Sequence, residues 1–163
     1  MTTPILQMTL SEAELTALAA RLAPRLVSGD CITLHGDLGA GKTTFARALI
    51  RAYLADPALE VPSPTFALRQ DYAGPRGAIV HFDLYRIADT RELDEIGFDE
   101  ALAGSVVIVE WPERAGATLP AARIGIALAD TANPDLRHLT ITCAPAADAR
   151  LTRLFEPPSQ SQN

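Results

Sequence analysis

Residues 36–43 are the part of the chain whose residue types and spacing most directly indicate a chemistry. They read Gly-Asp-Leu-Gly-Ala-Gly-Lys-Thr and fit the pattern G-x-x-x-x-G-K-[ST] of a phosphate-binding P-loop. The glycines allow a tight loop whose backbone N–H groups point inward at a phosphate. Lys42 would reach the β- and γ-phosphates, and the Thr43 hydroxyl would sit on Mg²⁺. The motif therefore predicts a nucleoside triphosphate site.

The segments on either side of this loop supply the context that the motif requires. The short apolar run over 31–35 suits a buried strand, and 44–54 carries apolar residues at helical spacing without glycine or proline. The N-terminus of that helix would add its dipole and unpaired amides to the phosphate site. The alternative, a glycine turn before an ordinary helix, gives no reason for lysine and threonine directly after the second glycine.

Two acids stand at the ends of other predicted strands. The strand over 78–83 ends in Asp83, and the β-branched run over 106–109 is followed by Glu110. Because sites of such sheets lie at the carboxyl ends of the strands, we expect both acids above the P-loop. A P-loop enzyme needs an acid that helps to hold Mg²⁺ and a group that positions the attacking water. Either acid could take either role, and the alternative for each is a solvated acid at a strand end.

Four further features are secondary candidates. Ser-Pro-Thr at 63–65 is a candidate switch loop whose hydroxyls approach the γ-phosphate or the metal, and the alternative is a proline-stiffened connector. His81 is expected to be a packed, hydrogen-bonded strand residue rather than a catalytic one. Trp111 is expected to be a packing residue more than a ligand contact. Arg86 is a candidate for charge near the phosphates or for an ion pair with a nearby acid.

The apolar pattern predicts an α/β fold of the P-loop NTPase type. We expect a central, mainly parallel sheet, because the run over 106–109 looks buried on both faces, with antiparallel hairpins added and helices flanking it. Ser11 and Glu14 form a capping-box pair that begins the first helix, and Pro24 ends or kinks it. The predicted strands cover 6–10, 31–35, 67–72, 78–84, 106–109, 124–128 and 139–143, and the predicted helices cover 11–24, 44–54, 89–97, 99–103 and 147–154.

Length, composition and charge limit the classes of function. With 163 residues we expect a single domain over 1–155 and a polar, disordered tail over 156–163. The net charge of −6 argues against a broad basic surface for nucleic acid. No leader sequence and no apolar stretch long enough to span a membrane are evident, so a cytoplasmic location without membrane contact is expected. Cys31 and Cys143 fall in apolar runs and are expected to be buried free thiols.

Four motifs in order resemble one family. They are the P-loop over 36–44, Ser-Pro-Thr-Phe over 63–66, His-Phe-Asp-Leu-Tyr-Arg over 81–86 and Glu-Trp-Pro-Glu-Arg over 110–114. In this order and spacing they resemble the bacterial TsaE ATPases, the small P-loop component of tRNA threonylcarbamoyladenosine synthesis. The resemblance is strong over about residues 30–114, and each motif except the P-loop is weak alone.

The resemblance implies a role for particular residues. Asp83 would be the acid needed for hydrolysis, with Lys42 and the switch-loop Thr65 beside the reacting phosphate. Thr43 and Glu110 would hold Mg²⁺. The implied ATP-binding residues are Gly39, Ala40, Gly41, Lys42, Thr43 and Thr44, together with Glu12 near the nucleotide and, on a loose alignment, Arg137 in the late hairpin.

The resemblance also implies partners, the TsaB–TsaD complex directly and tRNA only through that complex. ATP hydrolysis would act as a switch that resets TsaB–TsaD for turnover. Two alternatives use the same loop: a small-molecule kinase, or a nucleotide-dependent scaffold that barely hydrolyses ATP. The scattered arginines form no dense lid, which disfavours the kinase, and no N-K-x-D motif supports a GTPase. Because no finger arginine is evident, we expect slow hydrolysis by the isolated chain.

Overall fold

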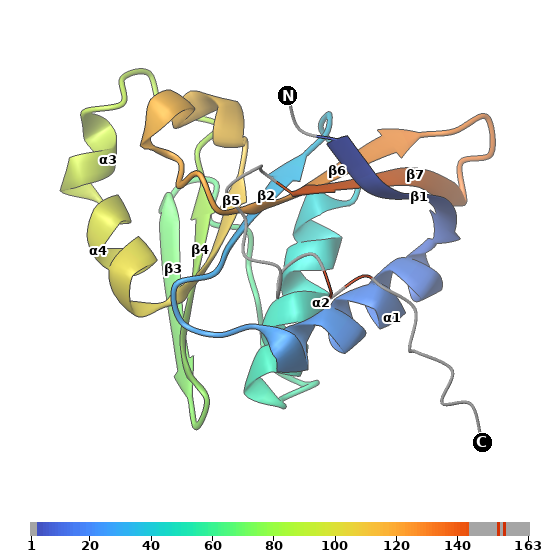
Figure 1. The fold of residues 1–163 in the computed structure, drawn as a ribbon, viewed down its shortest axis with the longest axis horizontal. Coiled ribbons are helices and arrows are strands. Elements are labelled where there is room, and N and C mark those ends of the chain that lie inside the picture. Colours follow the sequence, from blue (N-terminus) through green and yellow to red (C-terminus); the bar gives the residue numbers. More distant parts are fainter. Residues whose placement is uncertain (1–2, 144–152, 154, 156–163) are drawn as a thin grey trace.

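A computed structural model describes residues 3–143 of the chain, together with residues 153 and 155. Those residues form a seven-stranded sheet with the strand order β1-β7-β6-β2-β5-β4-β3 (Figure 1). The predicted helix over 147–154, apart from Arg153, and the predicted tail over 156–163 lie outside the described residues. The strands are β1 (Thr3–Ser11), β2 (Cys31–His35), β3 (Arg69–Gly74), β4 (Gly77–Asp83), β5 (Val106–Glu110), β6 (Ile124–Asp130) and β7 (Leu136–Cys143).

The centre of the sheet is parallel and its edges are antiparallel. β2 pairs in parallel with β5 and with β6, and β4 pairs in parallel with β5. The β3–β4 and β6–β7 pairs are antiparallel hairpins, and β1 pairs antiparallel with β7. These pairings confirm the predicted α/β class, its parallel centre and both hairpins. They also bring the first strand of the chain beside the last described one.

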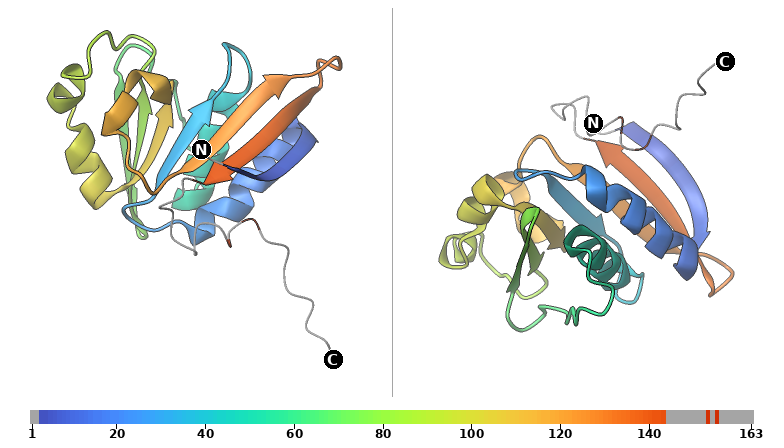
Figure 2. Two further views of the ribbon diagram at one scale, coloured as in Figure 1. Left: turned by 45° about the horizontal axis from the view of Figure 1, so that its top comes forward. Right: turned by 90° about the horizontal axis from the view of Figure 1, so that it is seen from below.

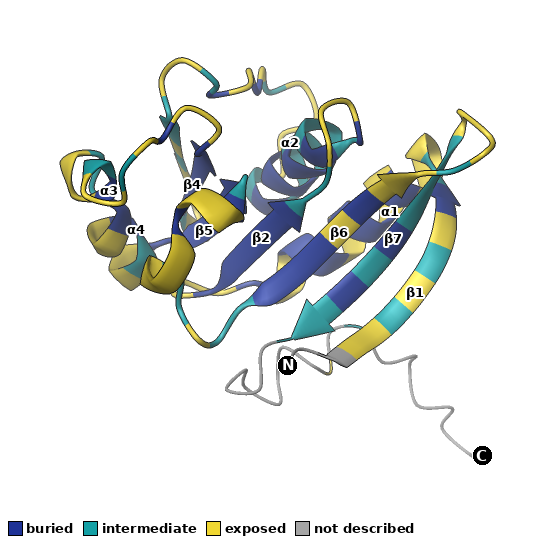
Figure 3. Ribbon diagram, turned by 90° about the horizontal axis from the view of Figure 1, so that it is seen from above, coloured by how far each residue is buried: buried dark blue, intermediate teal, exposed yellow. Residues whose placement is uncertain are grey.

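Helices flank the sheet on both sides. α1 (Glu12–Leu22) and α2 (Lys42–Leu54) lie side by side across one face, as the view from below in Figure 2 shows. α3 (Glu92–Glu95) and α4 (Phe98–Gly104) lie at the other end of the sheet and cover the opposite face there. The part of the opposite face formed by β6, β7 and β1 carries no helix in the described residues (Figure 3).

The central strands are buried on both faces, as parallel strands require. In β5, Val106 and Ile108 pack into the apolar core that contains α1 and α2, whereas Val107 and Val109 pack into the core that contains α3 and α4. β2 is likewise buried along most of its length (Figure 3). This alternation confirms the prediction that the β-branched run is a central strand. It also fixes which way the last residue of each strand points.

The local signal at Ser11 predicted the start of α1 correctly, whereas β3 starts later than predicted. The capping box at Ser11 is present, with the Glu14 N–H 3.2 Å from the Ser11 hydroxyl and the Ser11 N–H 2.7 Å from the Glu14 carboxylate. β3 begins at Arg69 rather than at residue 67. The reason is a tight turn in which Leu68 adopts a positive φ of 65° and donates its N–H to the carbonyl of Pro64 at 2.7 Å.

Gly36 gives a testable prediction for the fold. Its φ is +146°, and a Cβ added there would lie 2.5 Å from the backbone carbonyl oxygen of Leu128 in β6. Because that carbonyl belongs to a paired strand, Gly36→Ala should destabilise the protein by about 1–3 kcal/mol, the typical cost of local backbone strain. Thermal unfolding should register this as a fall in Tm of several degrees. Gly104→Ala is the matched control, since nothing lies within 4 Å of its added Cβ. Equal melting temperatures for the two variants would contradict the prediction.

Candidate functional site

The P-loop joins the buried strand β2 to the start of α2. Gly39 and Gly41 have φ values of 79° and 106°, a region in which side chains other than glycine are strained. Gly41 is the N-cap of α2, and its carbonyl accepts the Phe45 N–H at 3.0 Å as the first bond of the helix. The N–H groups of the first turn, Lys42 to Thr44, have no partner within the helix. The loop and the helix end together provide the backbone arrangement on which the predicted anion site depends.

Lys42 lies across its own loop. Lys42 is only 5% exposed, and its ammonium donates hydrogen bonds to the carbonyl oxygens of Gly36 and Asp37. Its Nζ also lies 4.1 Å from the centre of the Trp111 ring. Burial lowers the pKa of Lys42, and nearby acids, led by Glu110, oppose that shift. The one cationic side chain of the loop is thus held in place by two backbone carbonyls and the face of an aromatic ring.

Glu110 and Asp83 lie next to each other at the carboxyl edge of the sheet. The two residues are register partners at the ends of β5 and β4, and they are 2% and 4% exposed. The Thr43 hydroxyl donates to one carboxylate oxygen of Glu110 at 2.9 Å. The Thr65 hydroxyl donates to Asp83 at 3.2 Å, and the Tyr85 N–H donates to the other oxygen of Asp83 at 3.0 Å. Neither acid is the solvated strand-end carboxylate of the alternative interpretation.

These side chains line one pocket of about 280 Å³. The pocket brings together the P-loop, the segment 63–65 and both strand-end acids. Hydroxyl and carboxylate oxygens are the ligands that Mg²⁺ prefers, so the pair Thr43 and Glu110 fits this cation chemically. The residues that line the pocket are Leu38, Gly39, Gly41, Lys42, Thr43, Thr44, Ser63, Thr65, Asp83, Glu110 and Trp111.

A second pocket of about 460 Å³ lies on the other side of the P-loop and includes Glu12 and Arg137. Gly39, Gly41 and Thr44 line both pockets.

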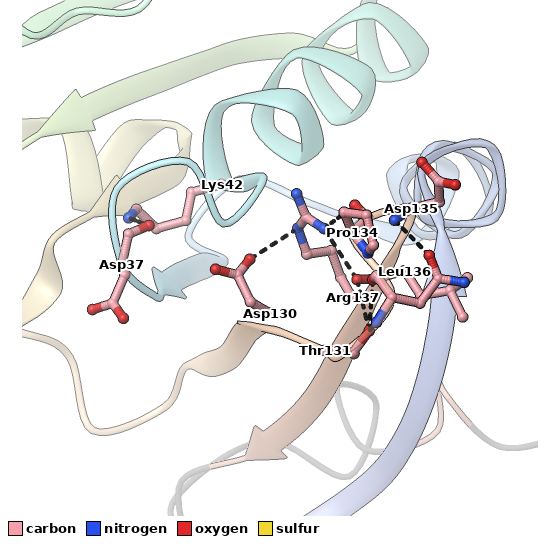
Figure 4. A network of polar contacts seen from close by, with 9 residues as sticks. Asp37, Lys42, Asp130, Thr131, Pro134, Asp135, Leu136 and Arg137 are labelled. Carbon is pink, nitrogen blue, oxygen red and sulfur yellow. Dashed lines mark hydrogen bonds and ion pairs between the residues drawn. The ribbon is translucent and has the colours of Figure 1, made fainter.

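Arg137 is held at the β6–β7 turn by Asp130, 3.4 Å away, and by the carbonyl of Pro134 (Figure 4). Of the residues predicted for nucleotide binding, only Ala40 lines neither pocket. Its side chain is buried, and its N–H bonds the carbonyl of Asp37 at 3.1 Å.

Three secondary candidates have partners that the sequence did not identify. His81 is buried and hydrogen-bonded, as expected, and its partner is Glu110, whose carboxylate lies 2.6 Å from Nε2, so this packed strand residue also touches the site. The available signal was the period of two in the strand, which puts residues 81 and 83 on one face. Arg86 stacks on Phe66, with its guanidinium carbon 4.4 Å from the ring centre. Trp111 contacts both Lys42 and Tyr85, so it packs and also lines the pocket.

A glycine loop between a parallel strand and a helix, facing two buried strand-end carboxylates across a pocket, defines a protein of the P-loop class. The family model described as "Threonylcarbamoyl adenosine biosynthesis protein TsaE" matches residues 9–138. The chain belongs to the TsaE family.

Known relatives agree with this assignment. The tRNA threonylcarbamoyladenosine biosynthesis protein TsaE of Rickettsia conorii is 45% identical over 103 residues, which are 63% of this chain and 58% of that protein. The protein of the same name from Streptomyces coelicolor is 37% identical over 132 residues, covering 77% of this chain and 87% of that one. The crystal structure of YdiB from Bacillus subtilis superposes with a TM-score of 0.71 at 29% identity, covering 88% of each chain.

No helix among the described residues is long and apolar enough to cross a membrane.

Lys42 allows a direct test of the predicted phosphate site because it is the only lysine in the sequence. An amine-acylating reagent can therefore modify this side chain and the N-terminal amine of the chain. We expect ATP with Mg²⁺ to suppress acylation of Lys42, as measured by mass spectrometry, because its ammonium would face the phosphates. Acylation of the N-terminal amine is the internal control, and adenosine, which lacks phosphates, should not protect. Labelling of Lys42 that proceeds without ATP and is not reduced by ATP would exclude the loop as the binding site.

Proposed function

We propose that this protein binds and hydrolyses ATP with Mg²⁺ and acts in the biosynthesis of threonylcarbamoyladenosine in tRNA. The observation that carries the proposal is the 2.9 Å contact between Thr43 of the P-loop and Glu110 at the end of β5. That contact joins a phosphate-binding helix start to a buried carboxylate, the pairing that a metal-assisted phosphoryl site requires. Membership of the TsaE family supports the same pathway.

Each residue of the first pocket has a role in this proposal. The backbone amides of residues 39–44 bind the phosphates, and Lys42 neutralises charge on the β- and γ-phosphates. Thr43 and Glu110 hold Mg²⁺, which would neutralise the charge that develops on the phosphates. Asp83 orients the attacking water, and the 3.2 Å bond from Thr65 to Asp83 ties the switch segment to that acid.

The second pocket suits the rest of the nucleotide. It is contiguous with the P-loop through Gly39, Gly41 and Thr44, and it lies beyond the phosphate end of the site. Glu12 and Arg137 supply one acidic and one basic side chain there. A ribose and a base could therefore lie against α1 and the β6–β7 turn while the phosphates lie in the loop.

The proposed partner is the TsaB–TsaD complex, with tRNA bound through that complex, in the cytoplasm. Large apolar side chains are exposed beside the phosphate pocket: Leu38 is 72% exposed and Phe66 is 83% exposed. Leu38 belongs to the P-loop, and Phe66 follows the switch residue Thr65 directly. Exposed apolar side chains mark a protein–protein contact where they gather in one patch, and we propose that a partner covers Leu38 and Phe66 together. A partner seated there would touch the segments that touch the nucleotide.

The placement of the arginines, among the described residues, supports the proposal that hydrolysis is slow without a partner. Arg69 pairs with Asp71 at 2.7 Å, and Arg91 pairs with Asp89 at 2.7 Å. Neither lines the phosphate pocket, and no arginine does within the part of the chain that the structure describes. An arginine at the transferring phosphate is worth about 10³–10⁵ in rate where it is present.

The test of the proposed function is ATP hydrolysis by the purified protein alone and with TsaB–TsaD, alongside formation of the modified adenosine on tRNA. We expect slow release of phosphate by the isolated protein and an increase of at least about tenfold with the complex, because the missing transition-state stabilisation would come from outside the chain. Rapid hydrolysis without partners would contradict this expectation. A phosphorylated metabolite in place of free phosphate would favour the kinase alternative.

Substitutions of Asp83 and Glu110 should change different kinetic quantities, kcat for Asp83 and the Mg²⁺ requirement for Glu110. Asp83→Asn should lower kcat by about 10²-fold or more while ATP affinity is retained, because it removes an interaction with the attacking water. Glu110→Ala should instead raise the Mg²⁺ concentration needed for half-maximal hydrolysis. Hydrolysis measured across a magnesium titration distinguishes the two. An unchanged magnesium requirement in Glu110→Ala would transfer the metal-binding role to Asp83.

A further inference from the structure

His81 and Glu110 form a fully buried pair behind the phosphate pocket. The Nε2 of His81 lies 2.6 Å from Oε2 of Glu110, and the two side chains are 0% and 3% exposed. The other oxygen of the same carboxylate, Oε1, accepts the Thr43 hydroxyl. His81 does not line the pocket itself, so it reaches the site only through Glu110.

The chemistry of the pair fixes which atom donates. A buried carboxylate is costly unless its oxygens accept hydrogen bonds, and a charge-assisted bond is short and strong. His81 Nε2 therefore carries a proton and donates it to Oε2. The Nδ1 atom of His81 is buried with no hydrogen-bond partner among the described residues. A bare Nδ1 is less costly there than an unpaired N–H, so the geometry favours Nε2 as the nitrogen that donates to Glu110.

The two strands make this contact possible. β4 and β5 are parallel neighbours with Asp83 opposite Glu110, so His81 stands two residues back along β4 on the same face as Asp83. From that position its ring contacts the Glu110 carboxylate at Oε2, the oxygen that does not accept the Thr43 hydroxyl. Loss of the His81 ring nitrogen would leave Oε2 of Glu110 buried without its donor. The Glu110 side chain could then adopt other rotamers.

We propose that His81 is a positioning residue that holds Glu110 in the one orientation in which Oε1 faces Thr43. This inference rests on the proposed Mg²⁺-ATP site and assigns a function to a residue outside the pocket. Residues behind a metal-binding carboxylate orient it, and their loss typically weakens metal binding by about 10–100-fold. His81 would thus set the affinity for Mg²⁺ without touching the metal or the nucleotide.

A pair of amide substitutions tests the orientation directly. The amide nitrogen of glutamine lies about as far along the side chain as Nε2, whereas the shorter asparagine places its nitrogen near the position of Nδ1. Both variants bury one amide in the same core, so their costs in packing and desolvation are similar. Calorimetry of ATP binding at a series of Mg²⁺ concentrations, and again without Mg²⁺, gives the metal requirement separately from binding of the nucleotide.

We expect His81→Asn to raise the half-saturating Mg²⁺ concentration by about 10-fold or more, with His81→Gln close to the wild-type protein. Binding of ATP without metal should be the same in all three proteins. An equal shift in both variants, no shift in either, or a parallel loss of metal-free binding would overturn the positioning role. A wild-type protein that binds no ATP in the presence of Mg²⁺ would reject the proposed function instead.

A measurement on the unaltered protein covers the case in which the variants do not fold. Side-chain ¹⁵N–¹H spectra resolve the ring nitrogens of its three histidines. We expect the buried ring of His81 to carry its proton on Nε2, with a downfield proton shift that Glu110→Gln alters. A proton on Nδ1 with a bare Nε2 would exclude donation to Glu110 and would overturn the inference.

Discussion

Three charged side chains are buried together at the carboxyl edge of the sheet, and the arrangement of the site follows from the need to keep them there. Lys42, Asp83 and Glu110 are nearly inaccessible to solvent. Buried charges are tolerated only when they are paired or hydrogen-bonded. Here the Thr43 hydroxyl donates a hydrogen bond to Glu110, and the Thr65 hydroxyl donates one to Asp83. Backbone carbonyls accept hydrogen bonds from the Lys42 ammonium. Two negative charges and one positive charge leave an excess of negative charge, which favours a divalent cation.

Most of this site could be predicted from the sequence because its signals are local. The P-loop pattern specifies a strand before it and a helix after it, and the acids at 83 and 110 end strands that are recognisable by their apolar runs. The contact between His81 and Glu110 could not be predicted in the same way. It depends on β4 and β5 being neighbours, and strand order is set by non-local packing. The late start of β3 was missed because a positive φ at Leu68 has no signature in a residue other than glycine.

Glu12 and Arg137 show how distant residues come to one pocket. Arg137 matched the family only loosely in the sequence, yet the antiparallel pairing of β1 with β7 sets it opposite Leu10. Because α1 begins directly after β1, Glu12 then lies at the same end of the sheet, against the P-loop. The register of an edge pair therefore determines the second half of the site. The apolar alternation of the two strands excludes a shift of one residue but does not choose among shifts of two, so the sequence alone does not specify that register.

The position of Phe66 bears on how a partner could control hydrolysis under the proposed function. A partner shifts an equilibrium only if it binds two states of the protein with different affinity. Phe66 is exposed and stacks with Arg86, while its neighbour Thr65 bonds the acid proposed to orient water. A shift of the Phe66 backbone on docking would also displace Thr65, because one peptide bond joins them. The segment that carries Thr65 and Phe66 thus links an exposed apolar side chain to the hydrogen bond between Thr65 and Asp83. A partner that docks on Phe66 would have to preserve its stack with Arg86 or replace it with another contact.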